Sequence, residues 1–406
     1  MKVLVINSGS SSIKFQLFEM EAEQVLASGL VERIGEETGR ISCSMHPESF
    51  NQRRTIEKEM RIPDHKSGME MVGEVLCDEQ NGVVRSRGEI GLVGHRVVHG
   101  GEAFHQPTVI DNKVIEAIKD NIPLAPLHNP ANLDGIEVAM ELFPAIPQVA
   151  VFDTAFHQTI PQRAHIYALP YELYESHRVR RYGFHGTSHK FVAGECARLM
   201  DRKLSETNLI TIHLGNGCSM SAVEHGRSID TSLGMTPLEG LVMGTRSGDV
   251  DPAIHSFLER AAGMDLTRID AMLNKDSGLK GICGFNDMRD IHAAVAEGDQ
   301  RARLALEVQT YRNKKYIGAF MAVLGRVDAL VFTAGIGEND PLVRQKTVAG
   351  LEHLGIELDT EKNSKRFKSP GTIHTSGSRV QIWVIPTNEE LAIARESLSV
   401  LEDKIQ

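Results

Sequence analysis

The sequence has 406 residues, with 54 Asp or Glu against 44 Lys or Arg, and its net charge is −10. A chain of this length exceeds what one hydrophobic core usually supports, so we expect two domains. The acidic balance argues against a general nucleic-acid-binding protein, and no apolar run approaches the roughly 18 residues of a membrane span.

The cysteine pattern and the first residues of the sequence indicate the cellular compartment of the protein. Five cysteines are scattered along the chain and none forms a C-x-x-C pair, so the sequence predicts neither a disulfide framework nor a zinc site. The apolar run after Met1 and Lys2 is too short for the core of a signal peptide. We therefore expect a cytoplasmic protein with free thiols.

Residues 3–18 (VLVINSGSSSIKFQLF) have the pattern of a β-hairpin. An apolar run leads to six small polar residues at 7–12, and apolar and polar residues alternate after them. The polar turn offers hydroxyls, an amide, backbone N–H groups and the nearby Lys14, which are the parts of a phosphate cradle. A Ser-rich surface turn is the alternative interpretation.

Residues 90–103 (IGLVGHRVVHGGEA) predict a buried strand that carries Arg96. Burying an unpaired charge costs several kcal/mol, so Arg96 should meet either an anionic ligand or an internal carboxylate. A helix is expected at 112–121, and the proline-rich loop 123–130 (PLAPLHNP) presents His128 before the next helix. In such a rigid loop, both a functional and a structural histidine are reasonable.

Residues 149–157 (VAVFDTAFH) predict a strand with Asp153 at its carboxyl end, where ligands bind in open α/β sheets. Capping of the next turn is the alternative role for this aspartate. Residues 180–193 (RRYGFHGTSHKFVA) place His185 before a helix that we expect to start near His189, capped by the Thr-Ser pair. The i, i+4 histidines do not indicate zinc, because the Glu of H-E-x-x-H is missing.

Two later strands also end in glycines. Residues 209–223 (LITIHLGNGCSMSAV) repeat the design of the first hairpin, with Gly215, Asn216 and Gly217 in the turn, and residues 328–339 (DALVFTAGIGEN) end in Gly-Ile-Gly before a helical region. Glycine lets the backbone approach a ligand closely, and a helix N-terminus favours anions. Two duplicated hairpins, one per domain, would grip a polyphosphate from both sides.

The remaining segments supply a loop and a closing helix. Residues 227–252 have little periodicity, and a loop this long in a compact domain is usually functional; it carries Arg246 within GTRSG. Residues 379–385 predict the last buried strand, which leads to Glu389. This glutamate either binds a metal or interacts with the helix macrodipole.

Three common signatures are absent from the sequence. The Gly-Lys-Ser/Thr end of a Walker A loop is missing, the protein-kinase set is missing, and G-x-S-x-G does not occur. A P-loop ATPase, a protein kinase and a serine hydrolase with that nucleophile motif are therefore excluded.

Taken together, the motifs resemble those of the acetate kinase family, a group of short-chain carboxylate kinases related to sugar kinases, Hsp70 and actin. They are NSGSSSIKF, HRVVHGGE, PLAPLHNP, VFDTAFH, YGFHGTSH, HLGNG, GTRSGDVDP and AGIGEN, in this order between about residues 3 and 390. The resemblance implies an α/β protein of two duplicated RNase H-like (actin-like ATPase) domains, with mixed sheets flanked by helices and the active site in the interdomain cleft. The expected domains are 1–153, completed by a C-terminal helix at 387–406, and a nucleotide-binding domain at 154–386.

The same resemblance implies a reaction. It is the reversible, Mg²⁺-dependent transfer of a phosphoryl group from ATP to acetate by direct in-line transfer, giving acetyl phosphate and ADP, with Mn²⁺ as a substitute metal. The expected enzyme is a cytoplasmic homodimer that binds neither nucleic acid nor membrane. An acetate-like acid is already an anion at neutral pH, so it needs no general base, and catalysis should rest on positioning and positive charge.

The resemblance also implies roles for individual residues. The catalytic residues are Arg96, His128, Asp153, His185 and Arg246. The acetate site is formed by Arg96, Val98, Leu127, Phe184 and Pro237. ATP is bound by Ser10, Ser12, Lys14, His213, Leu214, Gly215, Asn216, Gly217, Asp287, Met288, Arg289, Gly335, Ile336, Gly337, Glu338 and Asn339. The metal ligands are Asn7 and Glu389.

Two alternatives remain open. A propionate or general short-chain acyl kinase differs from an acetate kinase by about 1–3 kcal/mol of discrimination per methylene, and the β-branched Val98 favours acetate. An ATP-driven binding module of the Hsp70 or actin kind would need no carboxylate site, so Arg96, Arg246 and the two histidines argue against it.

Overall fold

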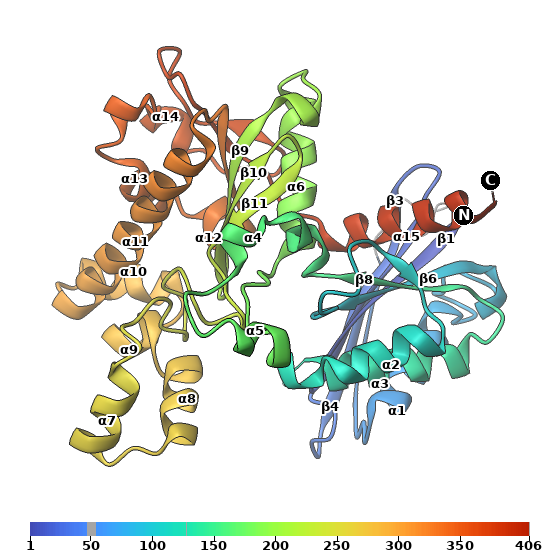
Figure 1. Ribbon diagram of the computed structural model, residues 1–406. Helices are drawn as coiled ribbons and strands as arrows, with labels where there is room; N and C mark the ends of the chain where they lie inside the picture. Colours follow the sequence, from blue (N-terminus) through green and yellow to red (C-terminus); the bar gives the residue numbers. More distant parts are fainter. Residues whose placement is uncertain (47–53, 127, 406) are drawn as a thin grey trace. The chain divides into compact units, whose positions relative to one another are not determined.

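The computed structural model describes residues 1–46, 54–126 and 128–405. The chain divides into two compact units (Figure 1). Unit 1 comprises Met1–Ala155 and Asn388–Gln406, and unit 2 comprises Phe156–Thr387. Each unit is built around its own β-sheet.

Unit 1 has a mixed sheet, with the strand order β5-β4-β3-β2-β1-β6-β8-β7 among the described residues. β1 to β5 form an antiparallel meander, β1, β6 and β8 run parallel, and β7 is antiparallel to β8. The strands are β1 (Lys2–Gly9), β2 (Ser12–Glu19), β3 (Gln24–Glu32), β4 (Gly39–Met45), β5 (Arg54–Met60), β6 (Ile90–Val97), β7 (Thr108–Val109) and β8 (Gln148–Phe152).

Helices cover both faces of this sheet. Leu4 and Ile6 of β1 belong to a core shared with α1 and α3, whereas Val3 and Val5 pack against α15. Successive residues of a strand face opposite sides, so the unbroken apolar run of β1 is what burial on two faces requires. The helices are α1 (His65–Leu76), α2 (Asn112–Asp120), α3 (Asn129–Leu142) and α15 (Glu389–Ile405).

Unit 2 also has a mixed sheet, with the order β11-β10-β9-β12-β14-β13. α6 packs on one face through Val192 and Cys196, and Figure 1 shows α11 on the other side of the sheet. The strands are β9 (Asn208–Leu214), β10 (Cys218–Glu224), β11 (Arg227–Thr231), β12 (Ala329–Thr333), β13 (Gly371–Thr372) and β14 (Gln381–Val384).

The helices of unit 2 follow and separate these strands. They are α4 (Gln162–His165), α5 (Glu172–His177), α6 (Gly186–Leu199), α7 (Ile254–Ala262), α8 (Leu266–Lys275), α9 (Gly278–Cys283), α10 (Met288–Ala296), α11 (Gln300–Leu324), α12 (Ala334–Asn339), α13 (Pro341–Val348) and α14 (Thr360–Asn363). Short 3₁₀ turns occur at Arg87–Glu89, Ile122–Leu124, Ala155–Thr159, Leu204–Glu206 and Glu352–Leu354.

Aspartate side chains fix several helix starts. Asp64 accepts a hydrogen bond from a backbone N–H in the first turn of α1, Asp111 does so for α2, and Asp299 accepts two such bonds at the start of α11. An N-cap of this kind stabilises a helix by about 1 kcal/mol. The long helix α11 ends at Leu324 and is followed by the C-cap residue Gly325, which has a positive φ of 69°.

The two sheets repeat one topology. β3-β2-β1-β6-β8-β7 corresponds strand by strand to β11-β10-β9-β12-β14-β13, and both orders combine an antiparallel hairpin, parallel central strands and an antiparallel edge strand. The predicted fold class, a duplicated α/β unit with mixed sheets flanked by helices, is confirmed.

The turn of the first hairpin is shorter than predicted. β1 continues to Gly9 and β2 begins at Ser12, so Asn7 pairs with Lys14 inside the ladder. The prediction of a six-residue polar turn was wrong, because backbone pairing extends through small polar residues that carry no apolar alternation.

Three other local predictions were also wrong. α6 begins at Gly186, and the N-cap position is taken by His185, which has a left-handed φ of 57°. The Gly-Ile-Gly of the third motif lies inside α12 rather than in a turn before it, and the first residues of the predicted loop 227–252 form β11.

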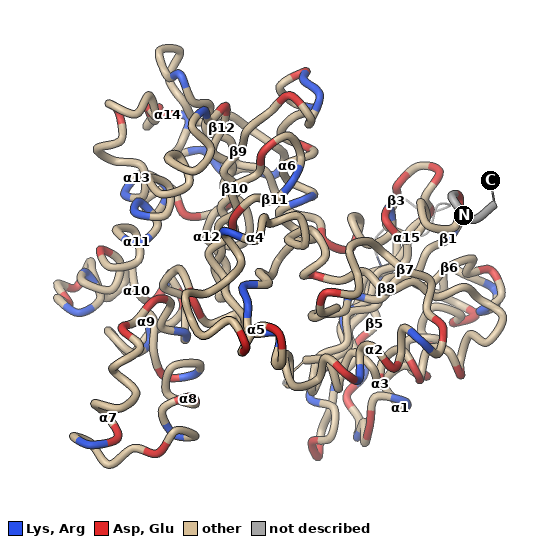
Figure 2. The backbone as a smooth tube through the Cα atoms, in the orientation of Figure 1, with Lys and Arg blue, Asp and Glu red and all other residues tan. Residues whose placement is uncertain are grey.

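Charged residues are distributed over both units. Figure 2 shows acidic and basic positions interspersed along the helices and loops of each. None of the helices in the described part of the chain has both the length and the apolar character that a bilayer-spanning segment needs.

Candidate active site

Four predicted site residues of unit 1 meet at one edge of its sheet. β1, β6 and β8 are parallel neighbours, so their carboxyl ends coincide. Arg96 of β6 forms an ion pair through Nη2 with Oδ2 of Asp153, which directly follows β8. Its Nη1 lies 3.5 Å from Oδ1 of Asn7, and its Nε lies 4.0 Å from Oε2 of Glu389 at the start of α15.

This cluster is largely withdrawn from solvent. The side chain of Asp153 is 1% exposed and that of Arg96 is 20% exposed. Of the two partners expected for Arg96, the structure shows the internal carboxylate; an anionic ligand stays a prediction. Burial raises the pKa of Glu389 to about 7, although Arg96 acts against this rise. The glutamate therefore lies where additional positive charge would be favourable.

The residues present fit a magnesium ion that is shared with a substrate. In the described part of the chain, no three His, Cys, Asp or Glu side chains gather as a metal site. Asn7 and Glu389 nevertheless offer oxygen atoms, and Mg²⁺ is commonly held by one or two protein oxygens together with waters and substrate phosphates. The donor set and the raised pKa of Glu389 suit a cation bound in this way.

The other predicted residues of unit 1 lie in varied surroundings. Ser10 is exposed in the turn, Ser12 begins β2, and the Nζ of Lys14 forms an ion pair with Glu390. His128 is half-buried at the N-cap position of α3, and its side chain makes no capping hydrogen bond. Leu127 lies outside the described residues.

Sequence reasoning missed Asn132, which links two predicted parts of the site. Its Nδ2 donates to the carbonyl of Ser8 at 2.7 Å, and its Oδ1 accepts from the backbone N–H of the buried Val98 at 3.0 Å. The first hairpin and the predicted acyl residue are therefore held by one side chain. A buried asparagine on the apolar face of a predicted helix was the available signal.

In unit 2, the predicted histidines belong to a network of rings and hydroxyls. His185 and His213 stack with ring centroids 4.2 Å apart. The Oγ of Ser219 lies 2.8 Å from Nδ1 of His185 and 2.8 Å from Nε2 of His189, and His189 is fully buried. Because burial lowers the pKa of His189 well below its usual value, its ring is neutral.

The same network extends to the residue before His185. Nε2 of the buried His157 donates to the carbonyl of Phe184 at 3.0 Å, and its Nδ1 lies 2.8 Å from Oγ of Ser228. Burial lowers the pKa of His157 to about 4, so the ring stays neutral and Nε2 carries the proton that the carbonyl accepts. These contacts fix the backbone that presents His185.

Arg246 lies beside His185 without a carboxylate partner in the described residues. Its Nη1 donates to the carbonyl of Pro237 at 3.1 Å, and burial lowers its pKa. A Cβ placed on Gly217 would lie 3.4 Å from Cε1 of His185 and 3.6 Å from Nη1 of Arg246. The glycine turn between β9 and β10 therefore lies directly against both side chains.

The other side of that turn opens into a pocket of about 900 Å³, a size suited to a nucleoside. Eight residues predicted to bind ATP line it, and these are Gly215, Asn216, Asp287, Met288, Arg289, Gly335, Ile336 and Asn339. Sequence reasoning missed the other lining residues, which are Asn286, His292, Val295, Ala296, Asp340, Pro341 and Leu342. Most of these are apolar residues on helices and carry no motif.

Several of the predicted ATP residues support the pocket from outside. Leu214 is buried in β9, and the carbonyls of Gly337 and Glu338 accept hydrogen bonds from the buried Arg344 at 3.0 and 2.9 Å. At the rim, hydrogen bonds from Arg289 hold the pKa of Asp287 at about 2.

A model of the acetokinase family matches residues 2–395. The chain belongs to the acetokinase family. It is 62% identical over 404 residues to the acetate kinase of Desulfotalea psychrophila, covering 99% of this chain and 100% of the relative. It is 54% identical over 402 residues to the acetate kinase of Oleidesulfovibrio alaskensis, with coverage of 99% and 100%.

Solved structures agree with this membership. Acetate kinase from Porphyromonas gingivalis aligns with a TM-score of 0.94 at 44% identity, covering 98% of this chain and 99% of that one. A propionate kinase from Francisella tularensis aligns with a TM-score of 0.91, also at 44% identity and with the same coverage. As a member of the acetokinase family, this protein is thus an enzyme, a phosphotransferase with a carboxyl group as acceptor.

Proposed function

We propose that this enzyme transfers the γ-phosphoryl group of ATP reversibly to acetate, giving acetyl phosphate and ADP. The observation that carries the proposal is the surroundings of Gly217. On one side of its turn lies the nucleoside-sized pocket, and on the other lie His185 and Arg246, a guanidinium with no carboxylate partner among the described residues. Positive charge next to a nucleotide pocket suits a transferring phosphoryl group.

Unit 2 supplies the groups that act on the phosphoryl group in this proposal. An oxygen of acetate attacks the γ-phosphorus in line, and the bond from that phosphorus to the bridging oxygen breaks, which leaves its electron pair on ADP. Arg246 donates to the equatorial oxygens, where charge spreads in the transition state. His185, whose Nδ1 lies 2.8 Å from Oγ of Ser219, is a further donor to these oxygens in the proposal.

Unit 1 supplies the residues that hold the carboxylate and the metal. Arg96 binds acetate, and Asp153 orients Arg96 through their ion pair. Asp153 is not a general base, because acetate is already ionised at neutral pH. His128 is a further donor.

Asn7 and Glu389 would hold Mg²⁺, or Mn²⁺ in its place. When bound, the ion would supply positive charge that offsets the negative charge of the phosphate groups. The raised pKa of Glu389 supports this assignment, since the carboxylate requires a nearby cation to stay ionised.

The proposed nucleotide site is the pocket of unit 2, with adenosine between α10 and α12 and the phosphates at Gly215, Asn216 and Gly217. Ser10, Ser12 and Lys14 form the second phosphate contact, and His213 stacks on His185. We further propose that the enzyme is a cytoplasmic homodimer, which light scattering after size exclusion tests: a monomeric mass would contradict it.

Propionate is the second candidate acceptor. The likeness to the Francisella propionate kinase is as high in identity as that to the Porphyromonas acetate kinase, so sequence identity does not separate the two substrates. Val98, Phe184 and Pro237 form the proposed acyl site, and the β-branched Val98 would crowd a longer chain. A higher kcat/KM for propionate than for acetate would replace acetate in the proposal.

Trapping the product with hydroxylamine tests the function. With ATP, Mg²⁺ and acetate, the enzyme should form acetyl hydroxamate in proportion to ADP. ADP formation without any acyl hydroxamate, for acetate, propionate and butyrate alike, would contradict the proposal and favour an ATP-driven binding module.

A further inference from the structure

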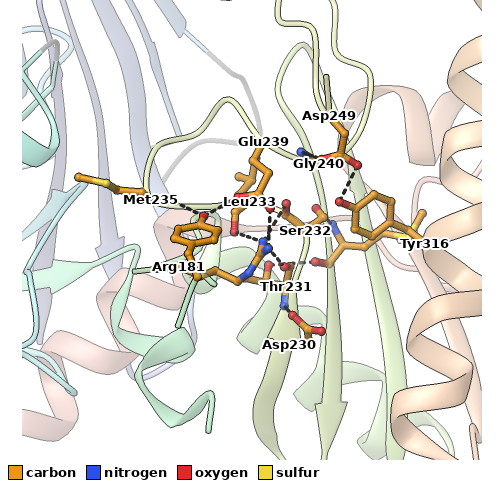
Figure 3. Close-up of polar contacts among 12 residues, drawn as sticks. Arg181, Asp230, Thr231, Ser232, Leu233, Met235, Glu239, Gly240, Asp249 and Tyr316 are labelled. Atoms are coloured by element: carbon orange, nitrogen blue, oxygen red, sulfur yellow. Dashed lines mark hydrogen bonds and ion pairs between the residues drawn. The ribbon is translucent and has the colours of Figure 1, made fainter. Parts of the chain in front are cut away.

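The proposed function leaves unexplained what holds the loop 232–252, which carries Pro237 and Arg246. In unit 2 this loop runs from the end of β11 to the start of α7 without forming a helix or strand of its own. A guanidinium on a mobile loop would be a poor catalyst, because misplacement by about 1 Å can lower a rate about a hundredfold. Two partly exposed carboxylates, Glu239 and Asp249, hold the loop in place through hydrogen bonds and ion pairs (Figure 3).

The first carboxylate is Glu239. Its Oε1 pairs with Nη2 of Arg181 at 2.5 Å, and its Oε2 accepts from the hydroxyl of Tyr167 at 2.5 Å. The hydroxyl of Tyr167 in turn accepts from the backbone N–H of Met235 at 3.0 Å. Figure 3 shows Arg181 and Glu239 pointing toward one another across the loop.

Arg181 also holds the beginning of the loop. Its Nη1 donates to the carbonyls of Thr231, Ser232 and Leu233 at 2.9, 3.3 and 3.0 Å. The carbonyl of Gly234 accepts from the backbone N–H groups of residues 182 and 183 at 3.0 and 3.1 Å. The same segment continues directly into His185, so Glu239 connects the loop with the backbone that presents this histidine.

The second carboxylate, Asp249, closes the part of the loop that contains Arg246. Its Oδ1 accepts from the N–H of Gly240 at 2.8 Å, and its own N–H donates to the carbonyl of Gly240 at 3.0 Å. Its Oδ2 accepts from the hydroxyl of Tyr316 at 2.9 Å and lies 3.2 Å from Nη1 of Arg312. Arg312 and Tyr316 belong to α11, so this helix anchors both ends of the segment 240–249.

The closed segment 240–249 contacts the turn at residues 215–217 between β9 and β10, which we call the phosphate turn because phosphate binding is proposed there. The N–H of Gly244 donates to the carbonyl of Asn216 at 2.9 Å, and the N–H of Met243 donates to the carbonyl of Arg246 at 3.2 Å. The two ends of the segment, Gly240 and Asp249, are therefore held by α11. Its middle, at Gly244, is held by the turn that lines the proposed nucleotide pocket. Arg246 lies between these two attachments.

We propose that Asp249 and Glu239 are positioning residues that fix Arg246 for phosphoryl transfer, with Tyr316, Arg312, Arg181 and Tyr167 as their anchors. Neither carboxylate pairs with Arg246 itself, so each acts through the loop. This inference rests on the proposed role of Arg246. It predicts that loosening either carboxylate lowers turnover without disturbing the adenosine pocket, whose lining residues lie outside the loop.

The central test is Asp249→Asn, which keeps the size of the side chain and removes its charge. The kcat should fall about tenfold or more while the KM for ATP changes by less than about threefold. Hydrogen exchange of the amides at 240–249 should become faster, and exchange in β9 and β12 should not change. If Asp249→Asn does not fold, Tyr316→Phe removes one hydrogen bond to the same carboxylate and should lower kcat in the same direction.

A matched control is Asp328→Asn in the same unit. Asp328 also pairs with an arginine, Arg202, and accepts a backbone N–H from Asn208, but it lies at the opposite end of β9 from the phosphate turn. This variant should lower the Tm and leave kcat unchanged. An unchanged kcat in both Asp249→Asn and Tyr316→Phe, an equal kcat loss in Asp328→Asn, or a kcat loss without faster exchange at 240–249 would overturn the inference. Failure of the unmodified enzyme to form acyl phosphate would instead overturn the proposed function.

Discussion

The two arginines of the proposed site have opposite surroundings. Arg96 is paired with Asp153 and faces Glu389, whereas Arg246 donates to a backbone carbonyl and has its pKa lowered by burial. A buried cation without a counter-charge gains most from an incoming anion. We therefore assign to Arg246 the largest share of charge stabilisation in the transition state, and to Arg96 the binding of the carboxylate.

Replacing Arg246 tests this division. Arg246→Ala should lower kcat about a hundredfold or more and change the KM for ATP by less than about threefold, because the lost charge matters most in the transition state. Steady-state kinetics of Arg246→Ala beside Arg198→Ala, an exposed arginine on α6 that pairs with Glu195, provide the comparison. A kcat close to that of the unmodified enzyme would remove Arg246 from the mechanism.

Val98 sets the expected length of the acyl chain. Val98→Ala should raise kcat/KM for propionate relative to acetate by about tenfold, the effect of roughly one methylene in an apolar pocket. Val149→Ala on β8 serves as the control, since it removes the same atoms from the core and should lower the Tm without changing the substrate ratio. If Val98→Ala and Val149→Ala have the same ratio of kcat/KM for propionate to kcat/KM for acetate, Val98 does not line the acyl site.

At the level of residues, motifs predicted the side chains that lie at strand ends and turns. Asn7, Arg96, Asp153 and Glu389 were predicted, and the structure brings them together. Glu239, Asp249, Asn132 and Ser219 were not, because each side chain has a partner 34 or more residues away, and no local spacing marks such a partnership.

At the level of elements, the loop 232–252, which carries Arg246, packs closely against the phosphate turn. Gly244 approaches the turn so closely that an added Cβ would lie 2.1 Å from Oδ1 of Asn216. Only glycine permits this approach without moving the side chain of Asn216, and Asn216 lines the proposed nucleotide pocket.

A methyl group at Gly244 should therefore damage nucleotide binding. Gly244→Ala is expected to raise the KM for ATP about fivefold or more, because the Asn216 side chain must move; the loss of one good hydrogen bond is worth about 1 kcal/mol. Gly194→Ala is the control, since its Cβ would meet nothing within 4 Å and alanine favours the helix α6. An unaltered KM in Gly244→Ala would exclude Asn216 as an ATP contact.

Sequence patterns predicted the strands and hairpins better than the boundaries between elements. Alternation and apolar runs identified β1, β2, β9, β10 and β12, because burial on one or two faces imposes them. The start of α6 was missed because His185 takes a left-handed conformation that a residue with a side chain rarely adopts. The helical state of Gly335 and Gly337 was missed because glycine is normally unfavourable there.

At the level of the whole molecule, the duplicated topology places one glycine-containing hairpin in each unit, β1–β2 and β9–β10, and both are proposed to contact phosphate. The repeated strand order was predictable only in outline, because the edge strands β7 and β13 are two residues long and leave no pattern. The domain boundaries expected at 153/154 and 386/387 stay a prediction, for which limited proteolysis is the direct measurement.

Each unit also buries a neutral histidine that should make stability depend on pH. Burial lowers the pKa of His95 and of His157 from 6.5 to about 4. Between these two pKa values the unfolded chain binds more protons than the folded chain. The contribution of each neutral ring to the free energy of unfolding is therefore complete above about pH 6.5 and is lost as the pH falls toward 4. Between pH 7 and pH 5 this amounts to about 2 kcal/mol per ring.

The variant His95→Gln isolates one of these rings. It retains a polar side chain near Gln148 and does not titrate, so its Tm should fall less between pH 7 and pH 5 than that of the unmodified enzyme. Thermal melts at both pH values measure the difference. Parallel Tm losses in the two proteins would show that His95 is not kept neutral by folding.

The central claim is that the phosphoryl group passes to acetate. Following ATP, Mg²⁺ and acetate by ³¹P NMR observes every phosphorus-containing product in one sample. Acetyl phosphate and ADP should grow together, and ATP should return when ADP and acetyl phosphate are supplied instead. Growth of inorganic phosphate and ADP alone from freshly added ATP, with no acetyl phosphate signal at any time, would contradict it.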